Sequence, residues 1–218
     1  MGTAVVVIVA YLLGSLAFAV LVSKAFRLPD PYTYGSGNPG ATNVLRTGNR
    51  MAALLTLAGD ALKGFVAVMA TTLSAPYLNL HETTIALSAI AVFLGHLYPI
   101  FFKLKGGKGV ATAAGILFGI HQWLGLLTLA TWVVIALFFR YSSLAALIAA
   151  IFAPFFTFFL IKSSAMLVAV SAISLLLIWR HRENIRKLLA GEEARIGEKK
   201  PEAGEGERSN PNADRKSA

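Results

Sequence analysis

Long apolar runs separated by short polar stretches make up most of this 218-residue chain. Residues 3–23, 51–73 and 84–102 each approach the ~20 apolar residues that a transmembrane helix needs. The neutral stretch SAPYLNLHET, between the second and third runs, is predicted to form a loop. This pattern is typical of an all-α, polytopic integral membrane protein.

Two later runs are too long to cross a membrane once. Residues 110–139 would form about 45 Å of helix, whereas the hydrocarbon core of a bilayer is about 30 Å thick. The polar pair His121 and Gln122 divides this run, and residues 162–164, Lys-Ser-Ser, divide residues 144–179. The sequence therefore predicts seven transmembrane helices, of which the fourth and the seventh are short.

The distribution of Lys and Arg among the loops predicts which way these helices face. With seven spans and the N-terminus outside, Lys162 is the one basic loop residue left outside, and the others are cytoplasmic. One break fewer would put the basic residues after position 179 outside, against the positive-inside rule. We therefore expect a cytoplasmic C-terminus, and a net charge of +9 that reflects this bias rather than nucleic-acid binding.

Residues 1–196 are predicted to form a single transmembrane domain. The first apolar run lacks a basic start and is too long for a signal peptide, so we expect it to be retained as a span. From Gly197 the chain is rich in Pro, Gly, Glu and Ser, which cannot bury a core. Residues 197–218 are therefore predicted to be a disordered cytoplasmic tail.

Three polar motifs interrupt the apolar pattern, each at the edge of an apolar run. The first motif, GSGNPGATNVLR, covers residues 35–46. Its glycines, including Gly35 and Gly37, let the backbone turn tightly and present N–H groups to an anion, while Ser36 and Arg46 add donors. Residues 35–40 match the G-x-G-x-x-G pattern of dinucleotide-binding proteins, but no strand is predicted before them, so the match is weak. A phosphate-binding loop is the functional interpretation, and a polar linker with a turn is the alternative.

The second motif, KLKGGKGVAT (residues 103–112), places Lys105 and Lys108 around flexible backbone at the start of a helix. It lacks the spacing of a Walker A loop, and a positive-inside anchor is an equally good interpretation of its lysines. In the third motif, RHRENIRKLL (residues 180–189), His181 and Asn184 share one helix face. A basic helix lying on anionic lipid would explain the arginines of this motif, but explains His181 and Asn184 less well.

All three motifs fall on the predicted cytoplasmic side, where they can form one pocket for phosphate groups that opens onto lipid. Ser143, at the cytoplasmic start of the sixth span, either faces this pocket or caps its helix. Asp60 and Lys63 lie one turn apart inside the second span, where ionisable groups are costly unless they are paired. An ion pair that fixes helix packing is the favoured interpretation of these two residues, and catalysis is the alternative.

These motifs, in this order, resemble the PlsY family of bacterial glycerol-3-phosphate acyltransferases. The likeness extends from about Tyr11 to Glu193. It includes AYLLGS at residues 10–15, DALKG at residues 60–64, GHLYPIFFKLKGGKGVAT from Gly95 and RHRENIRKLLAGEE from Arg180. The polar tail is the part that looks unlike a typical member.

The resemblance implies transfer of a fatty acyl group from acyl phosphate to glycerol 3-phosphate, giving lysophosphatidic acid (1-acyl-glycerol 3-phosphate) in the first step of bacterial phospholipid synthesis. It implies a multi-pass protein of the bacterial cytoplasmic (inner) membrane with a cytoplasmic active site. It also implies, as a candidate partner, the soluble enzyme that makes acyl phosphate, PlsX. The family roles fall on the candidate catalytic residues Ser36, Arg46, Lys108, His181 and Asn184. The candidate substrate- and phosphate-binding residues are Gly35, Gly37, Asn38, Asn43, Lys105, Gly106, Gly107 and Ser143.

Acyl phosphate is an activated mixed anhydride, so the glycerol hydroxyl can attack it directly and no covalent acyl-enzyme is expected. The absence of cysteine is then no obstacle. Either His181 or a substrate phosphate oxygen can accept the proton, while Lys108 and Arg46 stabilise the charge on the carbonyl oxygen and the departing phosphate. We expect no cofactor and no metal, because the carboxylates before position 180 are too few, namely Asp30, Asp60 and Glu82.

Three other functions fit the sequence less well. A transporter for an organic phosphate would share the cationic pocket but would need polar residues through its spans, which beyond Asp60 and Lys63 are almost entirely apolar. An acyl-CoA-dependent enzyme of the His-x4-Asp type is excluded, because none of the 4 histidines has Asp at that spacing. A CDP-alcohol phosphotransferase would need an acidic metal cluster, for which the carboxylates are too few.

Overall fold

Helices account for all the regular structure in residues 2–197, the part of the chain that the computed structural model describes. In chain order they are α1 (Gly2–Gly14), α2 (Phe18–Ala25), α3 (Ala41–Leu45), α4 (Arg50–Leu78), α5 (Glu82–Leu97), the 3-10 helix η1 (Ile100–Phe102), α6 (Val110–Ile120), α7 (Gln122–Phe139), α8 (Ser142–Leu160), α9 (Ser164–Arg180) and α10 (Arg182–Leu189).

Several of these helices are long and apolar enough to cross a membrane. By length and composition, 4 segments within residues 2–197 qualify alone: α4, α5 with η1, α7 and α8. The bent pairs α1–α2 and α9–α10 raise the number to 6 if each pair is one span. The apolar helix α6 is shorter than the helices counted as spans. The structure therefore confirms an all-helical, multi-pass membrane protein with between 4 and 6 candidate spans.

The two breaks predicted inside the long apolar runs are confirmed. Helix α6 ends at Ile120 and α7 begins at Gln122, because the chain becomes extended at His121. Helix α8 ends at Leu160 and α9 begins at Ser164. The side chain of Ser163 caps α9 by accepting a hydrogen bond of 3.2 Å from the amide of Met166.

Two boundary predictions were wrong. Residues 3–23 do not form one continuous helix, because the chain breaks after Gly14 and α2 leaves at an angle of 43°. The stretch SAPYLNLHET is helical in its first half, since α4 continues through Pro76 to Leu78 and ends at the left-handed Asn79. The third apolar run is one candidate span, Glu82–Phe102, in which α5 ends at Leu97 and Pro99 leads into η1.

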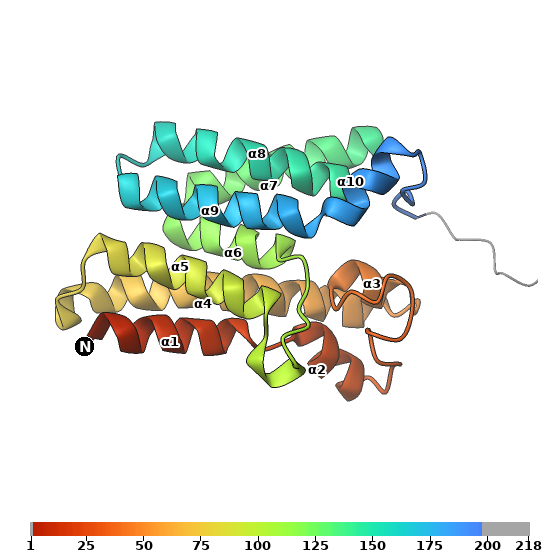
Figure 1. The fold of residues 1–218 in the computed structure, drawn as a ribbon, viewed down its shortest axis with the longest axis horizontal. Helices are drawn as coiled ribbons and strands as arrows, with labels where there is room; N and C mark the ends of the chain where they lie inside the picture. Colours follow the sequence, from red (N-terminus) through yellow and green to blue (C-terminus); the bar gives the residue numbers. More distant parts are fainter. Residues whose placement is uncertain (1, 198–218) are drawn as a thin grey trace, which may run out of the picture.

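Successive long helices run in alternating directions, and α6 lies between the α4–α5 pair and the α7–α8 pair (Figure 1). The α4–α6 contact is close enough to need glycine. A Cβ on Gly115 would lie 1.8 Å from the carbonyl oxygen of Ala61, and one on Gly64 would lie 2.3 Å from that of Thr112. Small residues at such crossings let backbones approach and gain van der Waals contact, which replaces the hydrophobic driving force inside a membrane.

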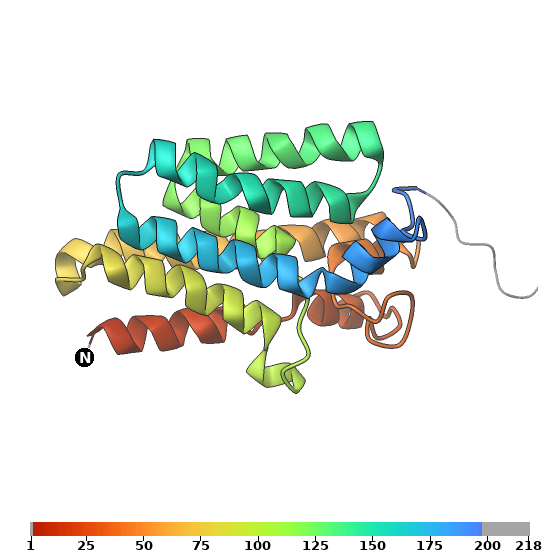
Figure 2. The same cartoon turned by 45° about the horizontal axis from the view of Figure 1, so that its top comes forward.

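The three motifs meet at one end of the bundle. Helix α3 with its preceding loop and helix α10 lie at the end opposite the N-terminus, and the loop between α5 and α6 lies between that end and the middle of the bundle (Figures 1 and 2). The chain bends by 56° between α9 and α10, so the third motif does not continue α9 in a straight line.

Candidate active site

The first motif folds around the buried side chain of Asn43. Its Oδ1 accepts hydrogen bonds from the amide of Ser36 (3.0 Å), from the hydroxyl of Ser36 (3.3 Å) and from Nη1 of Arg46 (3.5 Å). Its Nδ2 donates to the carbonyl oxygens of Pro31 (2.8 Å) and Tyr34 (3.2 Å). Asn43 thus organises the loop from inside, while Ser36 and Arg46 remain exposed for a ligand.

Gly35 is required in this loop for two reasons. Its φ of 60° lies in the left-handed region, and a Cβ there would lie 2.3 Å from Oδ1 of Asn43. Gly37 has a similar φ of 62°, and the half-buried Asn38 lies beside Gly40. Gly35, Gly37 and Asn38 therefore determine the backbone shape of the loop that carries Ser36.

The second motif is a loop held from two sides. The buried Gly106 and Gly107 accept hydrogen bonds through their carbonyl oxygens from Arg180, whose Nη2 lies 2.8 Å from the Gly106 oxygen and 3.1 Å from the Gly107 oxygen. The carbonyl oxygen of Lys105 accepts a hydrogen bond of 2.5 Å from the hydroxyl of Tyr32, which ties this loop to the residues before the first motif. The Lys105 side chain itself is exposed.

His181 lies at the bend between α9 and α10 and is 3% exposed. Its Nδ1 is 2.8 Å from the carbonyl oxygen of Leu177, which can only accept, so Nδ1 carries the proton and Nε2 carries the lone pair. Burial, aided by the nearby positive charges of Lys108 and Arg180, lowers the pKa of His181 from 6.5 to about 4, although the Leu177 bond and the charge of Glu193 oppose the shift. The imidazole is therefore neutral at physiological pH.

A chain of hydrogen bonds links Lys108 to Asn184, Asn184 to Glu193, and Glu193 to Ser143. Nζ of Lys108 donates to Oδ1 of Asn184 (2.5 Å), and Nδ2 of Asn184 donates to Oε1 of Glu193 (2.7 Å). The hydroxyl of Ser143 donates to the same Oε1 at 2.5 Å. Ser143 lies in the first turn of α8 and does not cap it, because the N-cap is Tyr141.

Glu193 is a residue of this cluster that sequence reasoning missed. Glu193 lies at the end of the stretch that resembles the PlsY family, but the sequence indicates no role for it. The sequence did contain a chemical signal, because a carboxylate that closely follows a strongly basic motif has nearby cations and amides to bind.

The electrostatics connect the first motif to this cluster. Burial lowers the pKa of Lys108, and the charge of Glu193 opposes that shift. The positive charges of Lys187, Arg180 and Arg46 lower the Lys108 pKa as well. Arg46 therefore lies within electrostatic reach of Lys108, and one region holds cations from all three motifs.

The predicted ion pair inside the second span is present. Nζ of Lys63 lies 2.8 Å from Oδ1 of Asp60, and both side chains are buried. His96, which the sequence does not connect with this pair, brings its Nδ1 to 3.4 Å from the same oxygen.

Comparison with known proteins gives a consistent result. A family profile described as "Glycerol-3-phosphate acyltransferase" matches residues 4–191. A glycerol-3-phosphate acyltransferase from Cupriavidus necator is 64% identical over 191 residues, which are 88% of this chain and 95% of that protein. One from Paraburkholderia phymatum is 60% identical over 200 residues, covering 92% of this chain and 95% of the relative.

Two crystal structures of PlsY (YgiH), an integral membrane glycerol 3-phosphate acyltransferase, have the same fold. The glycerol 3-phosphate form superposes with a TM-score of 0.84 at 38% identity, and covers 90% of this chain and 96% of that chain. The lysophosphatidic acid form gives a TM-score of 0.82 at the same identity and coverage. On the profile, the close relatives and the fold together, the chain belongs to the PlsY family of glycerol-3-phosphate acyltransferases.

Proposed function

We propose that this enzyme transfers a fatty acyl group from acyl phosphate to glycerol 3-phosphate and releases lysophosphatidic acid. The observation that carries the proposal is the convergence of Lys108, Asn184 and His181 with Arg46 at one end of the bundle. Both substrates bring phosphate groups, which bind best where several cations and amide donors meet. The related PlsY structures contain glycerol 3-phosphate in one form and lysophosphatidic acid in the other, which are the acceptor and the product of this reaction.

The reaction needs no nucleophile from the protein. The hydroxyl oxygen of glycerol 3-phosphate attacks the carbonyl carbon of acyl phosphate, a new ester C–O bond forms, and the C–O bond to phosphate breaks. Inorganic phosphate leaves with the bonding electrons. The hydroxyl proton goes to Nε2 of His181 or to a phosphate oxygen of a substrate, and the neutral state of buried His181 suits it to accept a proton.

In this proposal the remaining site residues bind and stabilise charge. Lys108 and Arg46 stabilise the negative charge that gathers on the carbonyl oxygen and on the departing phosphate. Ser36 and the glycine backbone of the first motif bind a phosphate group from the loop side. Asn184 and Ser143, joined through Glu193, hold the ammonium group of Lys108 in place. That Ser36, Lys108 and His181 line one cavity stays a prediction.

We also propose seven crossings, with the active site on the cytoplasmic side of the bacterial inner membrane. The alternating helix directions support this count if α1 with α2 forms one crossing and the short helix α6 forms another. The distribution of Lys and Arg supports the orientation. The long acyl chain of the donor then stays in lipid while its phosphate reaches the three motifs, and a soluble donor-producing enzyme such as PlsX has access to the same face.

The choice of acyl donor tests the proposal. Purified protein is incubated with glycerol 3-phosphate and, separately, with acyl phosphate, acyl-CoA or acyl carrier protein thioester, and lysophosphatidic acid is measured. We expect product from acyl phosphate alone. Lys108→Met serves as the matched inactive control, since it removes one cation from the site. Product from a thioester in the absence of acyl phosphate would refute the proposed donor.

A further inference from the structure

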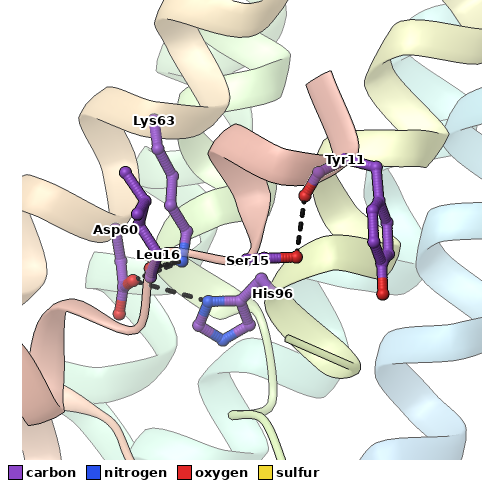
Figure 3. Close-up of polar contacts among 6 residues, drawn as sticks. All are labelled: Tyr11, Ser15, Leu16, Asp60, Lys63 and His96. Carbon is purple, nitrogen blue, oxygen red and sulfur yellow. Dashed lines mark hydrogen bonds and ion pairs between the residues drawn. The ribbon is translucent and has the colours of Figure 1, made fainter. Parts of the chain in front are cut away.

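A buried charged cluster lies beside the candidate active site and has no role in the proposed chemistry. Figure 3 shows Lys63 and His96 converging on Asp60, at 2.8 Å and 3.4 Å from its Oδ1. Asp60 and Lys63 belong to α4 and His96 lies near the end of α5. Their exposed fractions are 3%, 2% and 7%. Charged groups this deep among transmembrane helices are costly, so the cluster has to serve a purpose beyond filling space.

On one side the cluster holds the break between α1 and α2. Nζ of Lys63 donates a 2.7 Å hydrogen bond to the carbonyl oxygen of Leu16 (Figure 3). The amides of Val20 and Leu21 both bond to the carbonyl of Ala17, at 3.0 Å and 3.1 Å, so the helix itself does not use the Leu16 carbonyl. Lys63 therefore satisfies a backbone group that the break would otherwise leave unpaired in an apolar environment.

The first residue of α2 also packs on this part of α4. A Cβ on Gly59 would lie 2.3 Å from the ring of Phe18, so glycine is needed to admit the ring. Nζ of Lys63 lies 5.9 Å from the centroid of the same ring, within the range of a cation–π contact. The direction in which α2 leaves the break is thus set by Gly59, Lys63 and Phe18 together.

On its other side the cluster supports the glycines of the second motif. A Cβ on Gly107 would lie 2.4 Å from Nε2 of His96, and one on Gly106 would lie 2.0 Å from the His96 carbonyl oxygen. The same Cβ on Gly107 would lie 3.0 Å from the carbonyl oxygen of Pro39, which belongs to the first motif. Gly106 and Gly107, in the loop before Lys108, therefore pack directly against His96, next to the first motif.

The loop that contains Gly106 and Gly107 is held between His96 and the third motif. Arg180, the residue before His181, binds the carbonyl oxygens of Gly106 and Gly107. Lys108 follows Gly107 in the chain, and its Nζ donates a 2.5 Å hydrogen bond to Oδ1 of Asn184. A shift of His96 would move the glycines, and with them the point from which the Lys108 side chain extends.

We propose that Asp60, Lys63 and His96 act as one positioning unit, which fixes the α1–α2 break and the glycine loop so that Lys108 is held at the active site. The unit contacts neither substrate, and it acts by fixing the backbone of the loop that carries Lys108. The inference rests on the proposed acyl transfer. Because a displacement of about 1 Å can cost about 100-fold in rate, loss of the unit is expected to reduce turnover even in folded enzyme.

The first test separates positioning from stability. Asp60→Asn and Lys63→Gln each leave the partner charge buried and unpaired, whereas the double variant removes both charges and should regain much of the lost thermal stability. We expect kcat/KM for glycerol 3-phosphate, per folded enzyme, to fall at least about 10-fold in all three variants. Recovery of the double variant to within about threefold of wild type would overturn the proposal, because stability alone would then explain the single variants.

A matched control uses the same two helices. Thr71 of α4 and Ser88 of α5 form another buried polar contact, with their hydroxyl oxygens 2.9 Å apart. Thr71→Val removes this hydrogen bond far from the three motifs, so it is expected to lower the melting temperature while leaving kcat/KM per folded enzyme unchanged. A drop in kcat/KM equal to that of Lys63→Gln would also contradict a specific positioning role.

His96→Gln is the milder variant, since it breaks the contact with Asp60 without removing a permanent charge. We expect about a 10-fold loss of kcat/KM in folded protein, whereas wild-type activity would refute the proposal. Failure of every cluster variant to fold would show that the cluster serves stability, and would refute it as well. If wild-type enzyme makes no lysophosphatidic acid, the proposed function fails instead.

A second measurement does not depend on activity. The chain has 0 cysteines, so Phe101→Cys and Leu189→Cys, both at exposed positions, can carry spin labels on the two sides of the glycine loop. We expect the distance distribution between the labels to shift or broaden with Lys63→Gln and to stay unchanged with Thr71→Val. An unchanged distribution in the Lys63 variant would count against the positioning role.

Discussion

Arg46 and Arg186 carry the same charge at the same end of the bundle, but their surroundings differ. Arg46 follows the glycine-rich loop of the first motif and contacts Asn43, and its charge lowers the pKa of Lys108. Arg186 has a side chain that is 78% exposed and contacts Glu183 at 3.4 Å on its own helix. The first environment suits a bidentate contact with a substrate phosphate, and the second suits a general positive charge near lipid headgroups.

Replacement of each arginine by lysine is therefore expected to have unequal effects. Lysine keeps the charge but cannot reproduce a planar fork of donors, so Arg46→Lys should lose about 10- to 100-fold in kcat/KM for glycerol 3-phosphate. Arg186→Lys should be nearly silent. The measurement is made in membranes at matched expression, and equal losses or the reverse order would assign the phosphate contact to the third motif.

The buried His181 predicts a dependence of stability on pH. Its pKa is about 4 in the folded protein and 6.5 as an ordinary histidine, so between these values the unfolded chain binds more protons than the folded one. The stability that neutral His181 contributes is complete above pH 6.5 and is lost progressively as the pH falls toward 4. The melting temperature of the wild type should fall over this window, and His181→Asn should flatten that fall relative to wild type. Parallel curves would contradict the assignment.

Individual residues differ in how well the sequence predicted them. The Asp60–Lys63 pair was predictable, because residues one turn apart in a membrane helix have few other ways to be stabilised. The contribution of His96 was not, since the approach of α5 to α4 brings it to Asp60 from a distant part of the chain. The contacts of Glu193 with Ser143 and Asn184 likewise depend on the 56° bend after α9.

At the scale of helices, the α4–α6 contact gives a graded prediction. Gly115→Ala would place a Cβ 1.8 Å from a backbone oxygen of α4, which cannot move without separating the helices. Gly119→Ala, one turn further along α6, meets its nearest neighbour at 3.0 Å, at the side chain of Val68. Overpacking costs about 1–3 kcal/mol, so Gly115→Ala should lower the melting temperature clearly more than Gly119→Ala. Equal shifts would show that α6 moves freely against α4.

Helix boundaries were predictable where a polar residue marks them. His121 and Gln122 interrupt an apolar run, and the structure breaks there. The break between α1 and α2 has only a weak mark, since Gly14 and Ser15 are followed by residues 16–22, which continue the apolar pattern. It is stabilised by a contact from Lys63 on another helix, and a local pattern does not contain that information.

At the scale of the whole molecule, the two carboxylates in or beside the candidate active site already have partners. Asp60 is paired with Lys63 and His96, and Glu193 accepts hydrogen bonds from Ser143 and Asn184. A catalytic Mg²⁺ would need oxygen ligands that these contacts already use. Acyl transfer should therefore proceed at the same rate in excess EDTA, measured as lysophosphatidic acid formed per minute. Loss of activity on chelation, with recovery on addition of Mg²⁺, would overturn this expectation.

The orientation of the bundle in the membrane can be tested with single introduced cysteines, because the chain has none of its own. If the three motifs face the cytoplasm, the loop between α8 and α9 faces the other side, because α9 crosses the membrane between them in the proposed seven-span arrangement. A membrane-impermeant thiol reagent added to intact cells should then label Lys162→Cys, and should label Leu189→Cys only after the membrane is opened. Both variants replace exposed residues outside the candidate active site, so each should retain acyl transfer. Labelling of Leu189→Cys in intact cells would place the three motifs outside, away from a cytoplasmic supply of glycerol 3-phosphate.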